Sequence, residues 1–293
     1  MNARIARVTR ITVRVMVGFA LLLLLAAAGL WWWAGQEGSL DWLLRRVGGR
    51  VSLQGEGVQG SVRGAWHIQR IVWERDGLRL EAEDIRLEWQ PVALLGRTLQ
   101  LEQVQVARAR VIDRRPRSEE AMKLPQDLRL PWQVNVEQLQ VGTLSYRGRM
   151  ELDASGLAAQ YAFDGLRHRV ALQSLRLAGG DYRGAVKLLA IAPLTVDASL
   201  SGRFAAPVPG VERKVPLDFA LRAQGPASAI DATARLQVAP SAGLQGELPR
   251  ATASARLAPF AAMPVPRGEA DFQQLDLAMF WPAARLRTSA RSA

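Results

Sequence analysis

The chain has 293 residues, carries a formal net charge of +11 and contains no cysteine. The lack of cysteine excludes disulfides and thiolate catalysis. A basic chain attracts either nucleic acid or anionic lipid. Outside the N-terminus no basic cluster is interleaved with aromatic residues, and no nucleic-acid-binding motif occurs. We therefore predict no nucleic-acid partner and favour lipid headgroups as the partner of the positive N-terminus.

The N-terminus reads as a membrane anchor. Residues 1–14 include Arg10 and Arg14 and contain no acidic residue, and residues 15–33 form a stretch of 19 uncharged residues. As a helix rising 1.5 Å per residue, this stretch would span about 28 Å, close to the hydrocarbon thickness of a bilayer. We predict a cytoplasmic basic tail at 1–14 and a transmembrane helix at 15–33.

Three tryptophans close this stretch. Trp31, Trp32 and Trp33 suit the far membrane interface, where aromatic side chains concentrate. The alternative is a cleaved signal peptide with its cleavage site in residues 26–28, but the continuation Leu-Trp-Trp-Trp favours a retained anchor. The prediction is a single-pass protein of a bacterial inner membrane, with its N-terminus in the cytoplasm and its body in the periplasm.

Residues 34–49 form a short membrane-proximal segment. Ser39 is a plausible N-cap, and Gly48 and Gly49 are typical of a helix end. The apolar positions recur at helical spacing: Leu40, Leu43, Leu44 and Val47. We predict a helix from Ser39 to Val47 that lies on the membrane surface or covers the first end of a sheet.

A bent strand pattern recurs through the rest of the chain. The order apolar-x-apolar-x-x-apolar-x-apolar begins at five positions: Leu80, Leu99, Val134, Val170 and Ala270. Alternation at period 2 indicates a strand with one buried face. The extra polar residue would turn the second apolar pair to the other face unless a β-bulge accommodates it. We therefore predict bulged strands that keep all their apolar residues on one face.

These strands predict a mainly β protein. Strand-like alternation runs through residues 50–282 with short links that contain Gly or Pro, which is typical of an antiparallel meander rather than β-α-β units. A charged, proline-containing loop at Asp113–Pro131 interrupts the pattern, and residues 283–293 read as an unstructured tail. The predicted fold is an N-terminal transmembrane helix followed by an elongated, curved antiparallel β-sheet groove.

Motifs for chemistry are weak. Gly55, Gly57 and Gly60 satisfy GxGxxG, but no helix is predicted after them to bind a pyrophosphate, so we interpret them as hairpin glycines. His67 and His168 have no partners at metal-ligand spacing, and we interpret them as structural or surface residues. We predict no metal and no cofactor.

Two groups of carboxylates could suggest acid–base chemistry. Glu119 and Glu120 lie in an arginine-rich loop, and Glu81, Glu83 and Asp84 alternate with arginines on the polar strand face. Both groups read as solvated charge, and no serine, histidine and aspartate cluster stands out. The sequence therefore predicts that the protein is not an enzyme.

The apolar stripe allows two interpretations. Such a stripe is usually the packed core of a sandwich, yet almost no helix is predicted after residue 50 to cover it. An open gutter would instead expose more apolar surface than soluble proteins tolerate, unless it holds acyl chains. Both interpretations stay open from the pattern alone. The candidate lining residues are Leu80, Ala82, Ile85, Leu87, Leu99, Leu101, Val104, Val106, Val134, Val136, Leu139 and Val141.

One stretch resembles a known family. The segment from Ile85 to Leu99, IRLEWQPVALLGRTL, and the segment Leu130-Pro-Trp132 before the strand at Val134 resemble the TamB family, as do the anchor and the motif Trp281-Pro282. TamB is the inner-membrane component of the translocation and assembly module of Gram-negative bacteria. The resemblance covers residues 10–282.

The resemblance implies a taco-shaped groove of the AsmA-like, bridge-like lipid transfer class. It implies phospholipid transport between the two membranes, in support of outer-membrane homeostasis. A second role it implies is that of a scaffold in the secretion and assembly of autotransporters and outer-membrane proteins, acting with a TamA-type outer-membrane barrel. Family members are several times longer, so the chain is expected to correspond to their N-terminal portion, without the region that binds TamA.

Overall fold

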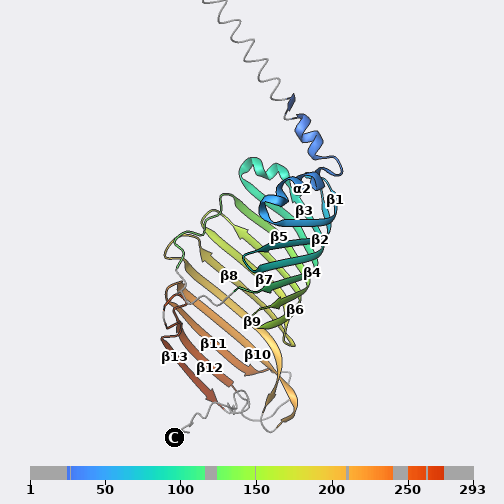
Figure 1. Cartoon of the computed structure of the whole chain (residues 1–293). Coiled ribbons are helices and arrows are strands. Elements are labelled where there is room, and N and C mark those ends of the chain that lie inside the picture. The colour runs from blue at the N-terminus through green and yellow to red at the C-terminus, as the bar shows by residue number, and fades with distance from the viewer. Residues whose placement is uncertain are drawn as a thin grey trace, which may run out of the picture.

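The computed structural model describes residues 25, 26, 28–115, 124–148, 150–208, 211–239, 250–261 and 263–273. One long twisted sheet dominates them, with helical segments gathered at its N-terminal end (Figure 1). The elements are α2 (Ser39–Val51), β1 (Leu53–Gly60), β2 (Trp66–Arg75), β3 (Leu78–Gln90), the 3₁₀ helix η1 (Pro91–Gly96), β4 (Thr98–Asp113), β5 (Gln133–Arg147), β6 (Glu151–Phe163), β7 (Arg167–Leu177), β8 (Gly180–Leu189), β9 (Thr195–Val208), β10 (Val211–Pro226), β11 (Ile230–Val238), β12 (Arg250–Leu257) and β13 (Arg267–Gln273).

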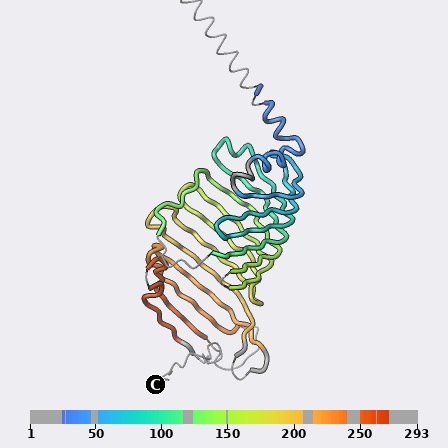
Figure 2. The backbone as a smooth tube through the Cα atoms, viewed as in Figure 1, coloured from blue at the N-terminus to red at the C-terminus, as the bar shows by residue number. Residues whose placement is uncertain are grey.

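The sheet follows the order of the sequence. Its 13 strands neighbour one another in chain order from β1 to β13, so the backbone passes steadily from blue to red along the molecule (Figure 2). Among the described strands β1 and β13 do not pair with each other, so the sheet is open rather than closed into a barrel. The prediction of a mainly β, elongated and curved sheet is confirmed.

The predicted bulges are present, and β7 shows how they work. Leu172 pairs with Gly184, and Leu175 pairs with Tyr182. Because Gly184 and Tyr182 are two residues apart on β8, they share a face, and their partners must share it too. Leu172 and Leu175 are three residues apart, so the shift of register between them keeps both leucines on one side of the sheet.

The copies of the pattern on β4 and β5 behave in the same way. Register shifts separate Val136 from Leu139 on β5, and they accompany the spacing from Leu101 to Val104 on β4. The copy on β3 differs: the backbone at Asp84 has a φ of +49°, and the register with β2 and β4 does not shift there. The fifth copy, which begins at Ala270, continues outside the described residues.

One prediction about the sheet is wrong. β4 and β5 pair in parallel, with Leu99 beside Val134 and Val111 beside Tyr146. A parallel pair requires the chain to return to the end where the first strand began. The Asp113–Pro131 loop makes that return: β4 ends at Asp113, and Gln133 then donates a backbone hydrogen bond to the carbonyl of Arg97 at the start of β4.

The last part of this connection crosses the sheet as a strap, residues 124–132. Leu128 donates a backbone hydrogen bond to Ala190, and Asp127 forms an isolated bridge with Ile191. The His168 Nε2 lies 3.0 Å from the Leu128 carbonyl and donates to it. His168 pairs with Phe163, which is only 2% exposed. The strap therefore closes this end of the face that carries Phe163.

The turn beside the strap gives a pH-dependent prediction. The Asp164 carboxylate accepts backbone hydrogen bonds from Leu166 and Arg167, and these bonds lower the pKa of Asp164. Because the pKa of this carboxyl group is lower in the folded protein than in the unfolded chain, ionisation stabilises the fold at any pH above the unfolded-state pKa. That contribution is lost as the pH falls through the folded-state pKa. We expect Asp164→Asn to lower the free energy of unfolding at pH 7, with the deficit shrinking below pH ~4. Denaturant titrations of both proteins across this range measure it, and a deficit independent of pH would contradict it.

The helix at the N-terminal end of the sheet begins at Ser39 as predicted, but its end and the role of Ser39 differ from the prediction. α2 continues through Gly48 and Gly49 to Val51, so the first strand begins at Leu53 rather than at residue 50. Ser39 does not cap it. Its hydroxyl donates to the Gln36 carbonyl at 2.8 Å and accepts from the backbone amide of Val62 at 3.0 Å. Ser39 thus ties the helix to the β1–β2 turn.

The predicted anchor lies mostly outside the described residues, as do the basic tail at 1–14 with Arg10 and Arg14 and the tail at 283–293. In the described part of the chain no helix combines the length and hydropathy needed to cross a bilayer. Of the predicted anchor, residues 28–33 belong to a described helix that continues to residue 34. The transmembrane helix at 15–33 therefore stays a prediction.

Candidate functional site: an apolar groove along the sheet

One face of the sheet is apolar across its whole length. Paired residues on neighbouring strands project to the same face, so the register traces rows of side chains across the sheet. The longest row crosses twelve strands: Trp66, Leu87, Val104, Leu139, Ala159, Leu172, Gly184, Leu200, Leu221, Ala234, Ala253 and Ala270. No charged or strongly polar side chain interrupts it. We call the side that carries this row the groove face.

The predicted lining residues all lie on the groove face. A parallel row beyond the bend joins Ala82 to Leu177 through Ala109, Leu144 and Ala154. The bulges on β4, β5 and β7 place the remaining residues on the same side. The structure therefore brings together Leu80, Ala82, Ile85, Leu87, Leu99, Leu101, Val104, Val106, Val134, Val136, Leu139 and Val141.

Their burial is intermediate between a core and a surface. Ile85 and Val136 are buried, Leu80 is 38% exposed, and the other nine are half-buried. Half-buried apolar side chains contact their neighbours along the sheet without being covered from above. The groove face in this part of the molecule is therefore partly open, as an acyl-chain groove requires.

A strongly apolar cleft lies farther along the sheet than the predicted residues. It has a volume of about 470 Å³, within the range of roughly 300–1,000 Å³ typical of ligand pockets. Its lining comes from β7 to β12: Leu175, Leu177, Tyr182, Leu200, Phe204, Phe219, Ala234, Arg235, Leu236, Ala251, Thr252 and Ala253. The sequence signal was present, because β9 to β12 alternate apolar and polar residues. They lack the extra polar residue of the repeated pattern, so they were not among its copies.

Two glycines lie next to the residues that line this cleft. Gly184 pairs with Leu200, and Gly202 pairs with both Tyr182 and Phe219 on the groove face. A Cβ at Gly202 would lie 2.4 Å from the Tyr182 ring, so any side chain there would displace the ring. Gly202 therefore leaves room for the Tyr182 ring, which lines the cleft.

A half-buried polar pair marks the closed end under the strap. The Tyr161 hydroxyl lies 2.8 Å from His168 Nδ1, and the His168 ring stacks on Phe163 at 4.5 Å between centroids. Because His168 Nε2 donates to Leu128, its Nδ1 accepts from the tyrosine when the ring is neutral. Burial raises the pKa of the Tyr161 hydroxyl. His168 is therefore structural, as predicted.

The opposite face carries the charge. Cross-strand ion pairs join Arg108 to Glu83 at 2.6 Å and Arg203 to Asp218 at 2.7 Å. The hydrogen bond to Asp218 raises the pKa of Arg203, which stays charged. The prediction that Glu81 is solvated is wrong, since its side chain is only 10% exposed and is bonded by Arg79 at 2.6 Å. The sheet thus separates an apolar face from an ionic one.

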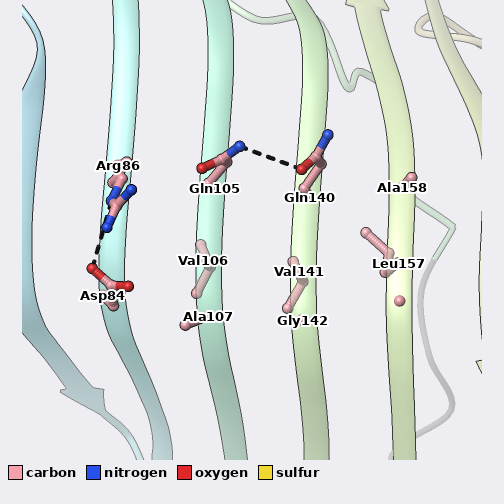
Figure 3. Close-up of a pocket in the computed structure, with 11 residues that line it drawn as sticks. Asp84, Arg86, Gln105, Val106, Ala107, Gln140, Val141, Gly142, Leu157 and Ala158 are labelled. Atoms are coloured by element: carbon pink, nitrogen blue, oxygen red, sulfur yellow. Dashed lines mark hydrogen bonds and ion pairs between the residues drawn. The ribbon is translucent and has the colours of Figure 1, made fainter.

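The bend across β3 to β6 forms a second hollow of about 420 Å³. Its polar lining includes Arg86 and Asp84 on β3 and the amides of Gln105 and Gln140, which meet across the parallel pair (Figure 3). Val106 and Val141 lie beside these amides on the same strands. The hollow mixes polar and apolar groups, so the groove face suits an acyl chain better.

The remaining motifs do not form a chemical site. Gly55, Gly57 and Gly60 are strand residues of β1 rather than hairpin glycines, and no helix follows them. His67 lies 2.8 Å from Asp84 on the exposed polar face. Glu119 and Glu120 lie outside the described residues. Within the described ranges no group of three or more His, Asp or Glu side chains could hold a metal ion.

No protein-family model, curated protein or solved structure matches the chain.

Proposed function

We propose that the protein holds the acyl chains of phospholipid on its groove face and provides a passive apolar track between the inner and outer membranes, supporting outer-membrane homeostasis. The observation that carries the proposal is the uninterrupted apolar row across twelve strands, leading into the 470 Å³ cleft. Burial of apolar surface contributes about 25 cal/mol per Å². This attraction is non-directional, so a bound chain can slide along the rows.

The proposed mechanism needs no catalytic group. The groove face offers a chain of leucine, valine and alanine contacts and excludes the ion pairs, which lie on the other face. A lipid headgroup would stay in water at the open side while the acyl chain contacts the strands. The direction of transport would come from the membranes at either end. In this proposal the apolar N-terminal stretch anchors the chain in the inner membrane, with the sheet in the periplasm.

Photo-crosslinking in living cells tests the proposal on the full chain. A benzophenone amino acid replaces Leu200 on the groove face, or the adjacent Ser201, which projects to the ionic face. Both residues are half-buried, so their burial is matched. We expect a phospholipid adduct, identified by mass spectrometry, at position 200 and none at 201. Absence of an adduct at 200, or equal adducts at both positions, would mean that the groove face packs as a dry core.

A second candidate function is strand addition during outer-membrane protein assembly. It rests on β13, which pairs only with β12 among the described strands and leaves its outer edge unpartnered. Open edges accept strands from other chains. Neighbouring backbone amides along a strand point to opposite sides. Of the two adjacent variants Ala270→Pro and Asp271→Pro, one therefore removes an amide from the outer edge of β13 and leaves the hydrogen bonds to β12 intact. If strand addition is the function, that variant should abolish assembly while a charge in the groove should not.

A further inference from the structure

The N-terminal end of the sheet carries large exposed apolar side chains. Leu95 is 89% exposed and Val92 is 59% exposed, and both lie on η1, which contains no buried residue. On the helical side, Trp32 is 69% exposed and Trp42 is 56% exposed. The connection between β3 and β4 does not need an exposed leucine or valine to fold, so these exposed side chains indicate an interaction site.

Direct contacts bring these side chains to one end. The Arg63 guanidinium stacks over the Trp31 ring at 4.8 Å. Its backbone amide donates to Ala34 at 3.0 Å. The preceding residue of the turn is Val62, whose carbonyl accepts a hydrogen bond from Trp89 Nε1 at 3.0 Å. Trp89 is the second residue before η1. The helix at 28–34, the β1–β2 turn and η1 therefore form one continuous surface.

α2 joins the same surface. Trp42 packs edge-on against Trp33, with 5.2 Å between the ring centroids. In Figure 1 the helix at 28–34 projects beyond this end of the sheet, next to α2. We define the docking end as Trp31, Trp32, Trp42, Val92 and Leu95.

We propose that the docking end inserts into the surface of an anionic bilayer, with η1 as a membrane contact separate from the N-terminal helix. Tryptophan and arginine place apolar bodies in the lipid boundary and polar tips in water. Two arginines lie directly beside it: Arg63 stacks on Trp31, and Arg97 follows η1. Next to Trp42 in the sequence is one acid, Asp41. Asp41 is already paired with Arg45 at 2.8 Å.

The chain before the helix favours a bilayer over a protein partner. The helix at 28–34 continues an uncharged sequence that begins at residue 15. Leu30 within this helix and Leu25 before it are each 66% exposed. The side chains of the docking end sit on a turn and on two helical segments rather than on one flat face. Separate apolar projections with positive charge between them suit a lipid surface, which accommodates any outline.

The docking end rests on the proposed function in one respect: the bilayer at this end would be the source or the acceptor of the acyl chains. The groove face begins at the same end, because Trp66 and Leu87 lead its longest row. A docked end would set the first strands of the groove against the lipid. The docking itself can be tested without any reference to the groove.

Because the chain contains no cysteine, single cysteines introduced into the 293-residue chain can be spin-labelled. We choose Leu95→Cys and Val92→Cys on η1. The control is Val265→Cys, which is 53% exposed and lies at the other end of the sheet, just before β13. The protein is reconstituted in vesicles of phosphatidylcholine with phosphatidylglycerol. Paramagnetic resonance then compares collisions of the label with oxygen, which enters lipid, and with a nickel chelate, which stays in water.

We expect a several-fold higher oxygen-to-nickel ratio at positions 92 and 95 than at 265, and a fall in that ratio when phosphatidylglycerol is omitted. A nickel-accessible label at 95 would overturn the inference. Protection of 95 from both reagents, with or without vesicles, would also overturn it and assign the surface to a second copy or another protein. A lipid-exposed 95 with no adduct at position 200 would uphold the docking and remove the groove function.

Discussion

Phospholipid that copurifies with the full chain is expected to fall several-fold in Leu200→Asp and to stay unchanged in Ser201→Asp. Leu200 lines the 470 Å³ cleft, whereas Ser201 projects to the ionic face beside Arg183. A carboxylate among apolar side chains must either stay hydrated or become protonated, and both outcomes disfavour an acyl chain beside it. Thin-layer or mass-spectrometric analysis of the extracted lipid measures the difference.

Leu200 is a better site for a charge than the buried residues of the groove face. Ile85 and Val136 are 8% and 9% exposed, so a charge at either would leave an unpaired ion in a packed environment and unfold the strand. Leu200 is half-buried and faces an open cleft, so a charge there can be hydrated. Circular dichroism and thermal unfolding of both variants provide the control. A folded Leu200→Asp protein that retains its lipid would contradict the acyl-chain groove.

The sequence allowed the strands and their bulges to be predicted because both are local features. Alternation marks the strand, and the extra polar residue between Leu172 and Leu175 marks the point where the register must shift. The copies of the pattern that begin at Leu80 and Leu99 lie inside β3 and β4. Each signal lies within a few residues of the structure it determines.

The parallel pairing of β4 and β5 could not be predicted from such signals. Both strands carry the same pattern, and that pattern is compatible with either direction of pairing. The direction is set by where the Asp113–Pro131 loop travels, which depends on contacts with residues far along the chain, such as Leu128 with Ala190. Ser39 was misread for a related reason: its hydroxyl bonds Val62, 23 residues away.

The candidate site was predicted only in part. The twelve predicted residues share the groove face, because a bulged amphipathic strand fixes which side chains share a side. The cleft lies instead at β7 to β12, where Tyr182 packs over Gly202 beside Leu200 and Phe219. Hollowing depends on which small residues become neighbours across strands. That information is in the register, and the sequence pattern alone does not determine it.

The bend in the sheet depends on close contact between two backbones. A Cβ at Gly142 would lie 2.6 Å from the carbonyl oxygen of Ala107 on the adjacent parallel strand. That oxygen belongs to the backbone and cannot rotate away as a side chain can. We expect Gly142→Val to lower the free energy of unfolding by about 3 kcal/mol, since overpacking forces the strands apart. Chemical denaturation of the full chain measures the change.

Thr143→Val provides the matched control for this prediction. It creates the same residue one position along β5, at an exposed site on the ionic face, and valine suits a strand as well as threonine does. We expect a change within about 0.5 kcal/mol, as is usual for surface substitutions. Equal effects at 142 and 143 would show that the bend tolerates a wider spacing of β4 and β5. A large loss at 142 alone would show that the curvature of the groove depends on the contact between Gly142 and Ala107.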